Sequence, residues 1–217
     1  MNSRSGIVLF GDVATSRRDA ARSSRWLRDL VVDFDRVYGR DKLARFGFTQ
    51  GDELQGLLSP DADPIMAVLR AALRPDALQM RWAVSRSQID PGSGPATERT
   101  GAAFLAAREA IVRAKTQRDG LIVVTGDAAT DTLLGNVAPL FAILLDELTD
   151  RQREIARLVL VEGLRQSEVA ERLNIKRPTV SVAYERARIR EIGRLRNALL
   201  ALLHGGLADD VSEGAAS

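Results

Sequence analysis

The chain lacks cysteine altogether and has a single histidine, His204, among its 217 residues. Disulfides and thiolate metal sites are therefore excluded, as is any metal site that needs several imidazoles. Long hydrophobic runs are also lacking near the N-terminus, because the apolar run from Gly6 to Phe10 is too short for a signal-peptide core or a membrane span. We therefore expect a cytoplasmic protein, with His204 exposed and without a role.

Charge is nearly balanced overall but unevenly distributed. The formal net charge is only +2. Between Arg151 and Arg196, however, 12 Arg and Lys residues stand against 6 Glu, whereas residues 1–150 hold 19 basic and 20 acidic groups. A near-neutral part is therefore joined to a basic part. The basic part favours a polyanionic partner, although a solvated Arg-rich helix gives the same count.

The first two thirds of the chain alternate between strand and helix patterns. Short apolar or β-branched runs predict strands, and apolar residues at helical spacing predict helices. The predicted strands are 6–10, 45–49, 53–58, 80–85 and 121–125; the predicted helices are 19–38, 64–73, 101–115 and 130–147, the last with a kink or break at Pro139. The opening order β-α-β-β-α-β is that of the ferredoxin-like fold, so we expect an α+β protein.

The composition changes after about residue 147, beyond which only helical patterns occur. We therefore expect an α/β domain over residues 1–146, followed by an all-α domain over residues 147–204. Residues 205–217 are small and polar, which predicts a disordered tail.

The all-α part contains two short predicted helices joined by a tight turn, the pattern of a helix-turn-helix. Thr149 and Ser167 are predicted N-caps, and Asn174 suits a sharp turn. The major groove of DNA admits one helix, whose first turn must present side chains that bond bases or phosphates. We predict DNA contacts from Gln166, Ser167, Arg177, Pro178, Thr179, Ser181, Val182, Glu185, Arg186 and Arg188. A helical dimerisation or capping element with incidental basic charge is the alternative.

Residues 148–188 resemble sigma-factor region four and LuxR-type helix-turn-helix proteins. The matching pieces are LTDRQ, EVAERL and PTVS, the last at the start of the second helix of the motif. The resemblance implies that Ala170 and Val180 are core residues, whereas Thr179, Ser181 and Val182 face the groove. It also implies double-stranded DNA as the partner. Since helix-turn-helix proteins usually bind as dimers, we expect a homodimer.

Two carboxylates in the α/β part suggest a metal site. Asp12 follows the first predicted strand, and Asp52 lies in the predicted hairpin turn beside Glu53. In a split βαβ sheet these two places lie side by side, and two carboxylates there can hold Mg²⁺. Gly-Asp is also a common turn pair, so both Asp side chains could instead cap local backbone groups.

The α/β part resembles class III nucleotidyl cyclases and the related diguanylate-cyclase fold. The two Gly-Asp pairs and the segment GPATERTGAAFLAARE at 94–109 carry the resemblance. It implies Mg²⁺ at the two carboxylates and a nucleotide contact from Arg108. The chain departs from the family where cyclases place an Asn and a purine-selecting Lys, since these positions hold Phe104 and Phe48.

The segments FGDV at 10–13 and FTQGDELQGLL at 48–58, together with the C-terminal motif, resemble the SatD family of small bacterial proteins. We interpret the chain as a DNA-binding transcriptional regulator, with no enzyme activity, whose degenerate cyclase-like domain dimerises or senses a ligand. The alternatives are a Mg²⁺-dependent nucleotidyl cyclase-like enzyme and a regulator gated by a nucleotide.

Overall fold

A five-stranded sheet forms the first part of the computed structural model, which describes residues 4–14, 20–49, 53–117 and 120–205. Strands β1 (Arg4–Val13), β2 (Lys42–Phe48), β3 (Glu53–Leu58), β4 (Met80–Ile89) and β5 (Leu121–Val124) lie in the order β2-β3-β1-β4-β5. Neighbouring strands are antiparallel except β4 and β5, which are parallel. The first four strands therefore have the predicted ferredoxin-like order, which confirms the α+β fold class.

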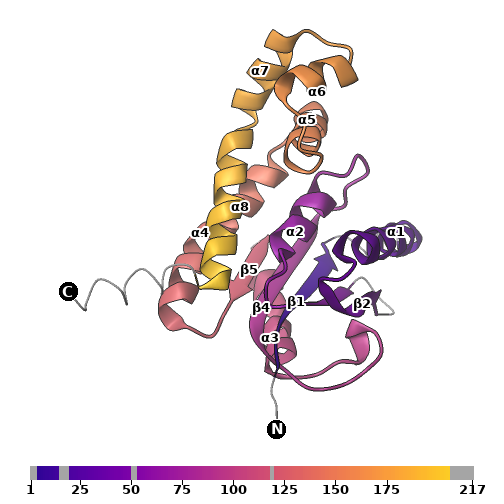
Figure 1. Ribbon diagram of the computed structural model, residues 1–217, viewed down its shortest axis with the longest axis vertical. Helices are drawn as coiled ribbons and strands as arrows, with labels where there is room; N and C mark the ends of the chain where they lie inside the picture. The colour runs from indigo at the N-terminus through magenta and orange to yellow at the C-terminus, as the bar shows by residue number, and fades with distance from the viewer. Residues whose placement is uncertain (1–3, 15–19, 50–52, 118–119, 206–217) are drawn as a thin grey trace, which may run out of the picture.

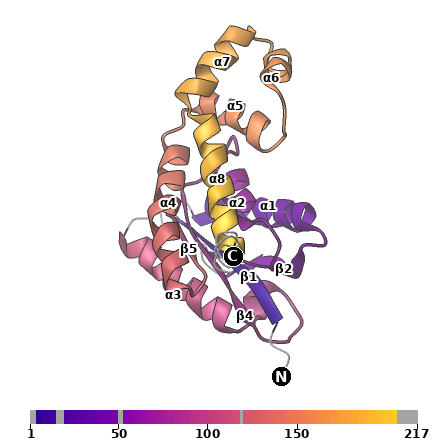
Figure 2. The same cartoon turned by 60° about the vertical axis from the view of Figure 1, so that its left-hand side comes forward.

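Helices cover both faces of the sheet (Figures 1 and 2). Helices α1 (Ala20–Tyr38), α2 (Pro64–Ala72) and α4 (Ala128–Asp146) cover one face, and α3 (Ala102–Gln117), preceded by the short 3-10 helix η2 (Ala96–Glu98), covers the other. Side chains alternate along β1, so that Ile7 and Leu9 face the first layer while Val8 and Phe10 face α3. Because β1 is buried on both faces, its centre is a continuous run of apolar residues.

Strands β1 and β4 are longer than predicted, whereas β3 has the predicted bounds. Strand β1 is paired on both sides, with β3 and with β4, over most of its length. These ladders stabilise positions beyond the apolar run, so Asp12, which we expected to follow the strand, lies within it. Helix α4 runs through Pro139 without a break.

The remaining helices extend away from the sheet and return to it. Helices α5 (Asp150–Leu160), α6 (Gln166–Arg172) and α7 (Arg177–Arg186) gather at the far end, and α8 (Ile189–His204) leads back against α4 and α2 (Figure 1). In its last turn, Leu203 O accepts a hydrogen bond of 3.1 Å from Arg86, and His204 Nε2 lies 3.1 Å from Ala62 O. The expectation that His204 is exposed and idle is wrong, because the end of α8 packs on the α/β part.

One apolar core joins the two parts of the chain. Phe141 of α4 and Leu199 of α8 belong to the same buried cluster as Trp26 and Trp82, which were predicted to be core residues. Among the described helices, α4 is long and apolar enough to cross a membrane, a criterion that a core helix of a soluble protein also meets. The predicted boundary at residues 146–147 falls between α4 and α5. That the two parts are separate domains stays a prediction.

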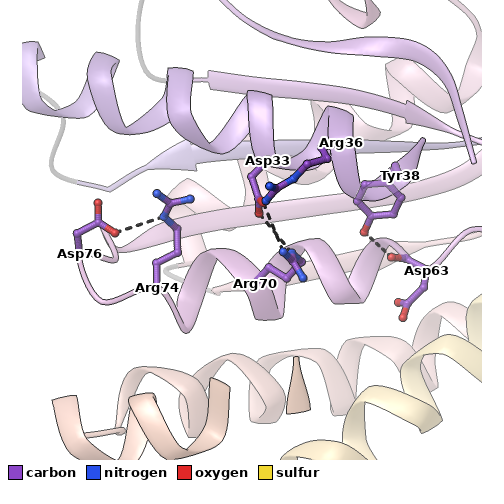
Figure 3. A network of polar contacts seen from close by, with 7 residues as sticks. All are labelled: Asp33, Arg36, Tyr38, Asp63, Arg70, Arg74 and Asp76. Atoms are coloured by element: carbon purple, nitrogen blue, oxygen red, sulfur yellow. Dashed lines mark hydrogen bonds and ion pairs between the residues drawn. The ribbon is translucent and has the colours of Figure 1, made fainter. Parts of the chain in front are cut away.

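Asp63 connects three helices, and Figure 3 shows its contact with Tyr38 of α1. Its carboxylate accepts a hydrogen bond of 3.0 Å from the backbone N–H of Met66 and so caps α2, and it also pairs with Arg196 of α8. Its backbone carbonyl accepts a hydrogen bond of 2.6 Å from the hydroxyl of Tyr38, at the end of α1. Burial raises the pKa of Tyr38, so this hydroxyl stays protonated and acts as a donor.

A second contact of α1 with α2 centres on Asp33 (Figure 3). Its carboxylate lies 2.7 Å from Arg36 and 3.3 Å from Arg70. Burial raises the pKa of Asp33, but the hydrogen bonds and charges of the two arginines together outweigh that effect and lower the pKa below 3.8.

Candidate nucleic-acid interface

Helices α5, α6 and α7, which we call the helical group, pack together at one end of the common apolar core. Thr149 and Gln152 form the predicted capping box, in which the backbone N–H of Thr149 donates to Gln152 Oε1 over 3.0 Å. The amphipathic faces of the three helices then meet, burying Ile155 and Leu158 of α5, Val169 of α6 and Val180 of α7. Ala170 and Val180 are 7% and 0% exposed, which confirms their expected core positions.

The turn between α6 and α7 has the expected sharp geometry. Asn174 adopts φ 49°, the left-handed region that asparagine tolerates better than most residues. The next backbone N–H, from Ile175, donates to Ala170 O over 2.9 Å and closes the turn. Lys176 is the N-cap of α7, and Pro178 lies in its first turn, where a missing N–H costs nothing.

The start of α6 differs from the prediction. Its N-cap is Arg165, whose backbone N–H donates to the Glu168 carboxylate over 2.6 Å. Ser167 therefore lies inside the first turn instead of capping it. The reason is that Glu168 stands three residues after Arg165 and satisfies its N–H in the manner of a capping box.

Most of the predicted DNA-contact residues are exposed. Ser167, Arg177, Pro178, Thr179, Val182, Glu185, Arg186 and Arg188 are exposed, while Gln166 and Ser181 are half-buried. Within α7, Val180 is the buried residue, so one side of the helix holds it in place and the other side faces solvent. Helix α7 also lies at the end of the molecule remote from the sheet (Figure 1). The roles of these residues in DNA binding stay predictions.

Positive charge at both ends of α7 is not compensated by ion pairs among the described residues. In the part of the chain that the structure describes, Lys176, Arg177, Arg186 and Arg188 form no ion pair. Glu185, in contrast, pairs with Arg190 at 3.0 Å. Lys176 was not among the predicted contact residues, and its place immediately before the helix is the signal that points to it.

The Arg-rich run after Tyr184 is divided between two helices. Arg188 adopts φ 51° and separates α7 from α8. In an uninterrupted helix, Ala187 and Ile189 would point about 200° apart, because successive residues are rotated by about 100°. The left-handed residue between them allows both side chains to be buried, at 5% and 0% exposure.

In the α/β part, the predicted metal and nucleotide residues form ion pairs with their own chain. Asp12 stands directly opposite Glu53 in the ladder of β1 and β3. Lys115 of α3 lies 2.7 Å from Asp12, and Arg108 of the same helix lies 2.7 Å from Glu53. Arg108 and Lys115 are seven residues apart, which places them on one side of α3, facing the sheet. The sequence reasoning missed Lys115, although this spacing was visible.

The described neighbours of Asp12 include two basic side chains. Lys115 and, at 3.7 Å, Arg81 already balance its charge, and the described residues include no group of three or more His, Asp or Glu side chains placed to hold a metal. Asp52 lies outside the described residues, so Mg²⁺ at Asp12 and Asp52 stays a prediction.

Arg108, like Asp12, contacts other side chains of the same chain. Besides its ion pair with Glu53, its guanidinium lies over the ring of Phe10, 4.9 Å from the ring centre. Phe104, at the position where cyclases carry an Asn, packs edge-on against the same ring at 6.2 Å. A nucleotide contact from Arg108 stays a prediction.

Comparisons with known proteins match the helical part. Residues 143–190 match the family model described as Sigma-70, region 4, a helix-turn-helix DNA-binding module that here spans the end of α4 through α7. No curated protein matches the chain. A bacterial light-regulated adenylyl cyclase is similar at 12% identity over 57% of this chain and 77% of that chain, with a TM-score of 0.41. A regulator of polyketide synthase expression from Bifidobacterium adolescentis is similar at 16% identity over 93% of this chain and 82% of that chain, with a TM-score of 0.27.

Proposed function

We propose that this chain is a cytoplasmic transcription regulator that binds double-stranded DNA by placing α7 in the major groove. The observation that carries the proposal is the exposed, uncompensated N-terminus of α7 within the segment that matches Sigma-70 region 4. An exposed helix end with basic and small polar side chains fits the groove sterically and electrostatically.

The side chains divide into two roles. Arg177 reaches base edges, where guanidinium groups bond guanine with two hydrogen bonds, and Thr179 and Ser181 bond base edges or phosphates. Arg186 and Arg188 lie farther along and meet phosphates, which adds affinity without sequence information. Gln166 and Ser167, at the start of α6, are placed to contact the backbone, as is usual for the first helix of the motif.

The α/β part, in this proposal, is a degenerate cyclase-like domain of the SatD type that dimerises the protein or senses a ligand. The second candidate function is a Mg²⁺-dependent nucleotidyl cyclase-like enzyme or a nucleotide-gated regulator. Fewer observations support it. Both forms place a ligand at Asp12 or Arg108, which already form ion pairs with Lys115 and Glu53. Turnover of ATP or GTP with Mg²⁺ or Mn²⁺, abolished by Asp12→Asn, is the result that favours the enzyme.

The test is a selection of genomic double-stranded DNA fragments on the purified full-length chain, followed by fluorescence anisotropy on the enriched sequence. We expect a short motif to be enriched and Thr179→Ala with Ser181→Ala to weaken its binding at least tenfold. Thr116→Ala, on the exposed side of α3, is the matched control and keeps wild-type affinity. Failure to enrich any sequence at moderate salt overturns the proposal.

A further inference from the structure

Helix α4 exposes an apolar face along an outer side of the molecule (Figure 2). Leu133, Leu140 and Ile143 on this face are between 45% and 54% exposed. The buried residues of the helix lie on its opposite side: Leu134, Ala138, Phe141, Ala142 and Leu145. No charged residue occurs in the chain from Thr132 to Leu145. Contiguous apolar surface of this kind marks a site of interaction.

The exposed aliphatic side chains of α3 have different surroundings. Leu105 and Val112 are 69% and 53% exposed. On the same helix Arg108, Glu109 and Arg113 are also exposed, so charged groups stand between and beside the two aliphatic residues. Single apolar side chains among charged ones are normal at a protein surface. The face of α4 therefore differs in kind from that of α3, which supplies a matched control.

The exposed residues of α4 have the spacing of a coiled-coil seam. Four of them follow one another at intervals of three, four and three residues: Leu133, Asn136, Leu140 and Ile143. We call these four residues the α4 seam. This spacing keeps side chains on one line along a helix, where they interdigitate with those of a second helix. Val137 and Leu144 beside the seam are half-buried and uncharged, so they widen the apolar strip.

We propose that the α4 seam packs in parallel against the α4 seam of a second copy of this chain. In a two-fold parallel pair, every seam residue faces its own counterpart. The three aliphatic residues then cover each other, and the Asn136 side chain, which both donates and accepts hydrogen bonds, faces an identical amide. Because a polar residue in a seam is satisfied only opposite such a group, Asn136 also fixes the register of the pair.

The charges of α4 do not suit the other common partner of an exposed apolar helix face, an anionic lipid surface. Such surfaces bind amphipathic helices whose polar side is rich in Lys and Arg. The charged residues of α4 and of its two caps are all acidic: Asp127, Asp131, Asp146 and Glu147. A second copy of the chain is therefore the better match to the face.

The parallel direction rests on the proposed function, which this inference deepens by naming the dimer contact. Helix α4 runs from the sheet to the helical group, and α5 begins at Asp150, shortly after α4 ends at Asp146 (Figure 1). A parallel pair therefore places both helical groups at one end of the dimer. Two α7 helices can then reach two half-sites of one DNA duplex, as in helix-turn-helix dimers. An antiparallel pair sends the helical groups to opposite ends.

The size of the α4 seam predicts a weak dimer. Stable interfaces use about 20–30 residues on each side, whereas the seam and its neighbours are far fewer. Glu147, at the next interval, ends the strip and faces its own counterpart, which lowers the affinity. We therefore expect a dissociation constant of about 1–100 μM without DNA. DNA with two half-sites strengthens the pair, because it holds two copies at a high effective concentration.

Self-association is measured first without DNA, by sedimentation equilibrium up to about 200 μM. Leu140→Glu places two like charges in the seam, so we expect it to weaken the dimer at least tenfold. Leu105→Glu, the same change on α3, keeps the dimer affinity within twofold. Circular dichroism tests that both variants are folded.

Three outcomes of this measurement overturn the inference. The first is a wild-type protein that stays monomeric over the whole concentration range. The second is a dimer that the folded Leu140→Glu variant leaves unaltered. The third is a monomer that binds phosphatidylglycerol vesicles and loses this binding in Leu140→Glu, which assigns the face to a lipid surface.

Cysteine cross-linking measures the direction of the pair. The chain has no cysteine, so each single-cysteine variant reports one position. Leu133 and Ile143 lie about 15 Å apart along α4. In a parallel pair, Leu133→Cys and Ile143→Cys both form a disulfide between copies under mild oxidation, whereas Leu105→Cys does not. An antiparallel pair brings at most one of the two positions near its own counterpart. Cross-linking of one variant alone, or of neither, overturns the parallel pair.

DNA selection separates this inference from the proposed function. If both are correct, the enriched sequence contains two inverted half-sites, and Leu140→Glu weakens binding to it at least tenfold while binding to a single half-site stays within twofold. A protein that dimerises through α4 but enriches no sequence retains the pairing and removes the proposed function. A protein that enriches a single half-site and stays monomeric retains the proposed function and overturns the pairing.

Discussion

Helices α3 and α7 both carry basic side chains that the sequence predicts to bind anions, and the two helices differ in what faces those side chains. Arg108 and Lys115 of α3 face the sheet and meet Glu53 and Asp12 at 2.7 Å. Arg177, at the start of α7, faces solvent and has no carboxylate partner among the described residues. A basic residue is available to an external anion only when the fold places no acid opposite it, and that depends on strand register and helix placement.

Reversing the charge at the start of α7 gives the largest expected effect. Arg177→Glu removes one attraction and adds a repulsion close to the phosphates, so we expect DNA affinity to fall about 100-fold or more at moderate salt. Fluorescence anisotropy on the selected DNA measures this. Arg108→Glu on α3 is the counterpart and leaves DNA affinity within twofold. Equal losses for the two variants would contradict the contrast between the helices.

Replacing Lys115, a partner of Asp12, tests whether the ion pairs of α3 stabilise the fold. Lys115→Met removes the ammonium group that lies 2.7 Å from a carboxylate that is 5% exposed, and it leaves Arg81 at 3.7 Å. We expect the free energy of unfolding to fall by about 1–3 kcal/mol, which urea denaturation measures. Arg113→Met, on the exposed side of α3, changes it by less than about 0.5 kcal/mol. Unchanged stability of Lys115→Met would show that α3 is not held by this ion pair.

Salt dependence separates the roles within α7. Arg186→Ala removes a proposed phosphate contact, so the slope of log K against log salt becomes less steep by about 1 and all DNA sequences lose affinity equally. Arg177→Ala, in contrast, relaxes the preference at one base pair. A change of sequence preference in Arg186→Ala would place that side chain on bases instead of phosphates.

The smallest expected effect is a pH dependence at Asp33. Its pKa is lower in the folded state than in the unfolded chain, so its contribution to stability is present above about pH 4. That contribution is lost as the pH falls through the lowered pKa. Asp33→Asn is therefore expected to make stability less dependent on pH below 4 than in the wild type. Asp29→Asn, on the exposed side of the same helix, keeps the wild-type profile.

The sequence predicted the kind and order of the elements better than the contacts of their side chains. Apolar runs predicted all five strands, because burial of a strand demands apolar residues at its centre, although β1 and β4 extend beyond those runs. Within the helix-turn-helix, the capping box at Thr149 and the turn at Asn174 were predicted because they are local features, and the resemblance implied the core position of Val180. The N-cap of α6 was predicted at Ser167 but lies at Arg165. The ion pair of Asp12 with Lys115 was not predicted, since it joins residues about a hundred positions apart.

Helix α8 returns from α7 to the sheet and so connects the two ends of the molecule directly. Its 16 residues span about 24 Å, with the turn at Arg188 and α7 at one end and the contacts of Leu203 and His204 at the other. A tilt of about 5° at the sheet end displaces the far end by about 2 Å, by the geometry of a rod of that length. Such a displacement is larger than the range of about 0.5 Å in donor–acceptor distance over which a hydrogen bond to a base edge forms. If α7 binds a DNA groove as proposed, a tilt of α8 of this size would therefore change the register between α7 and the bases.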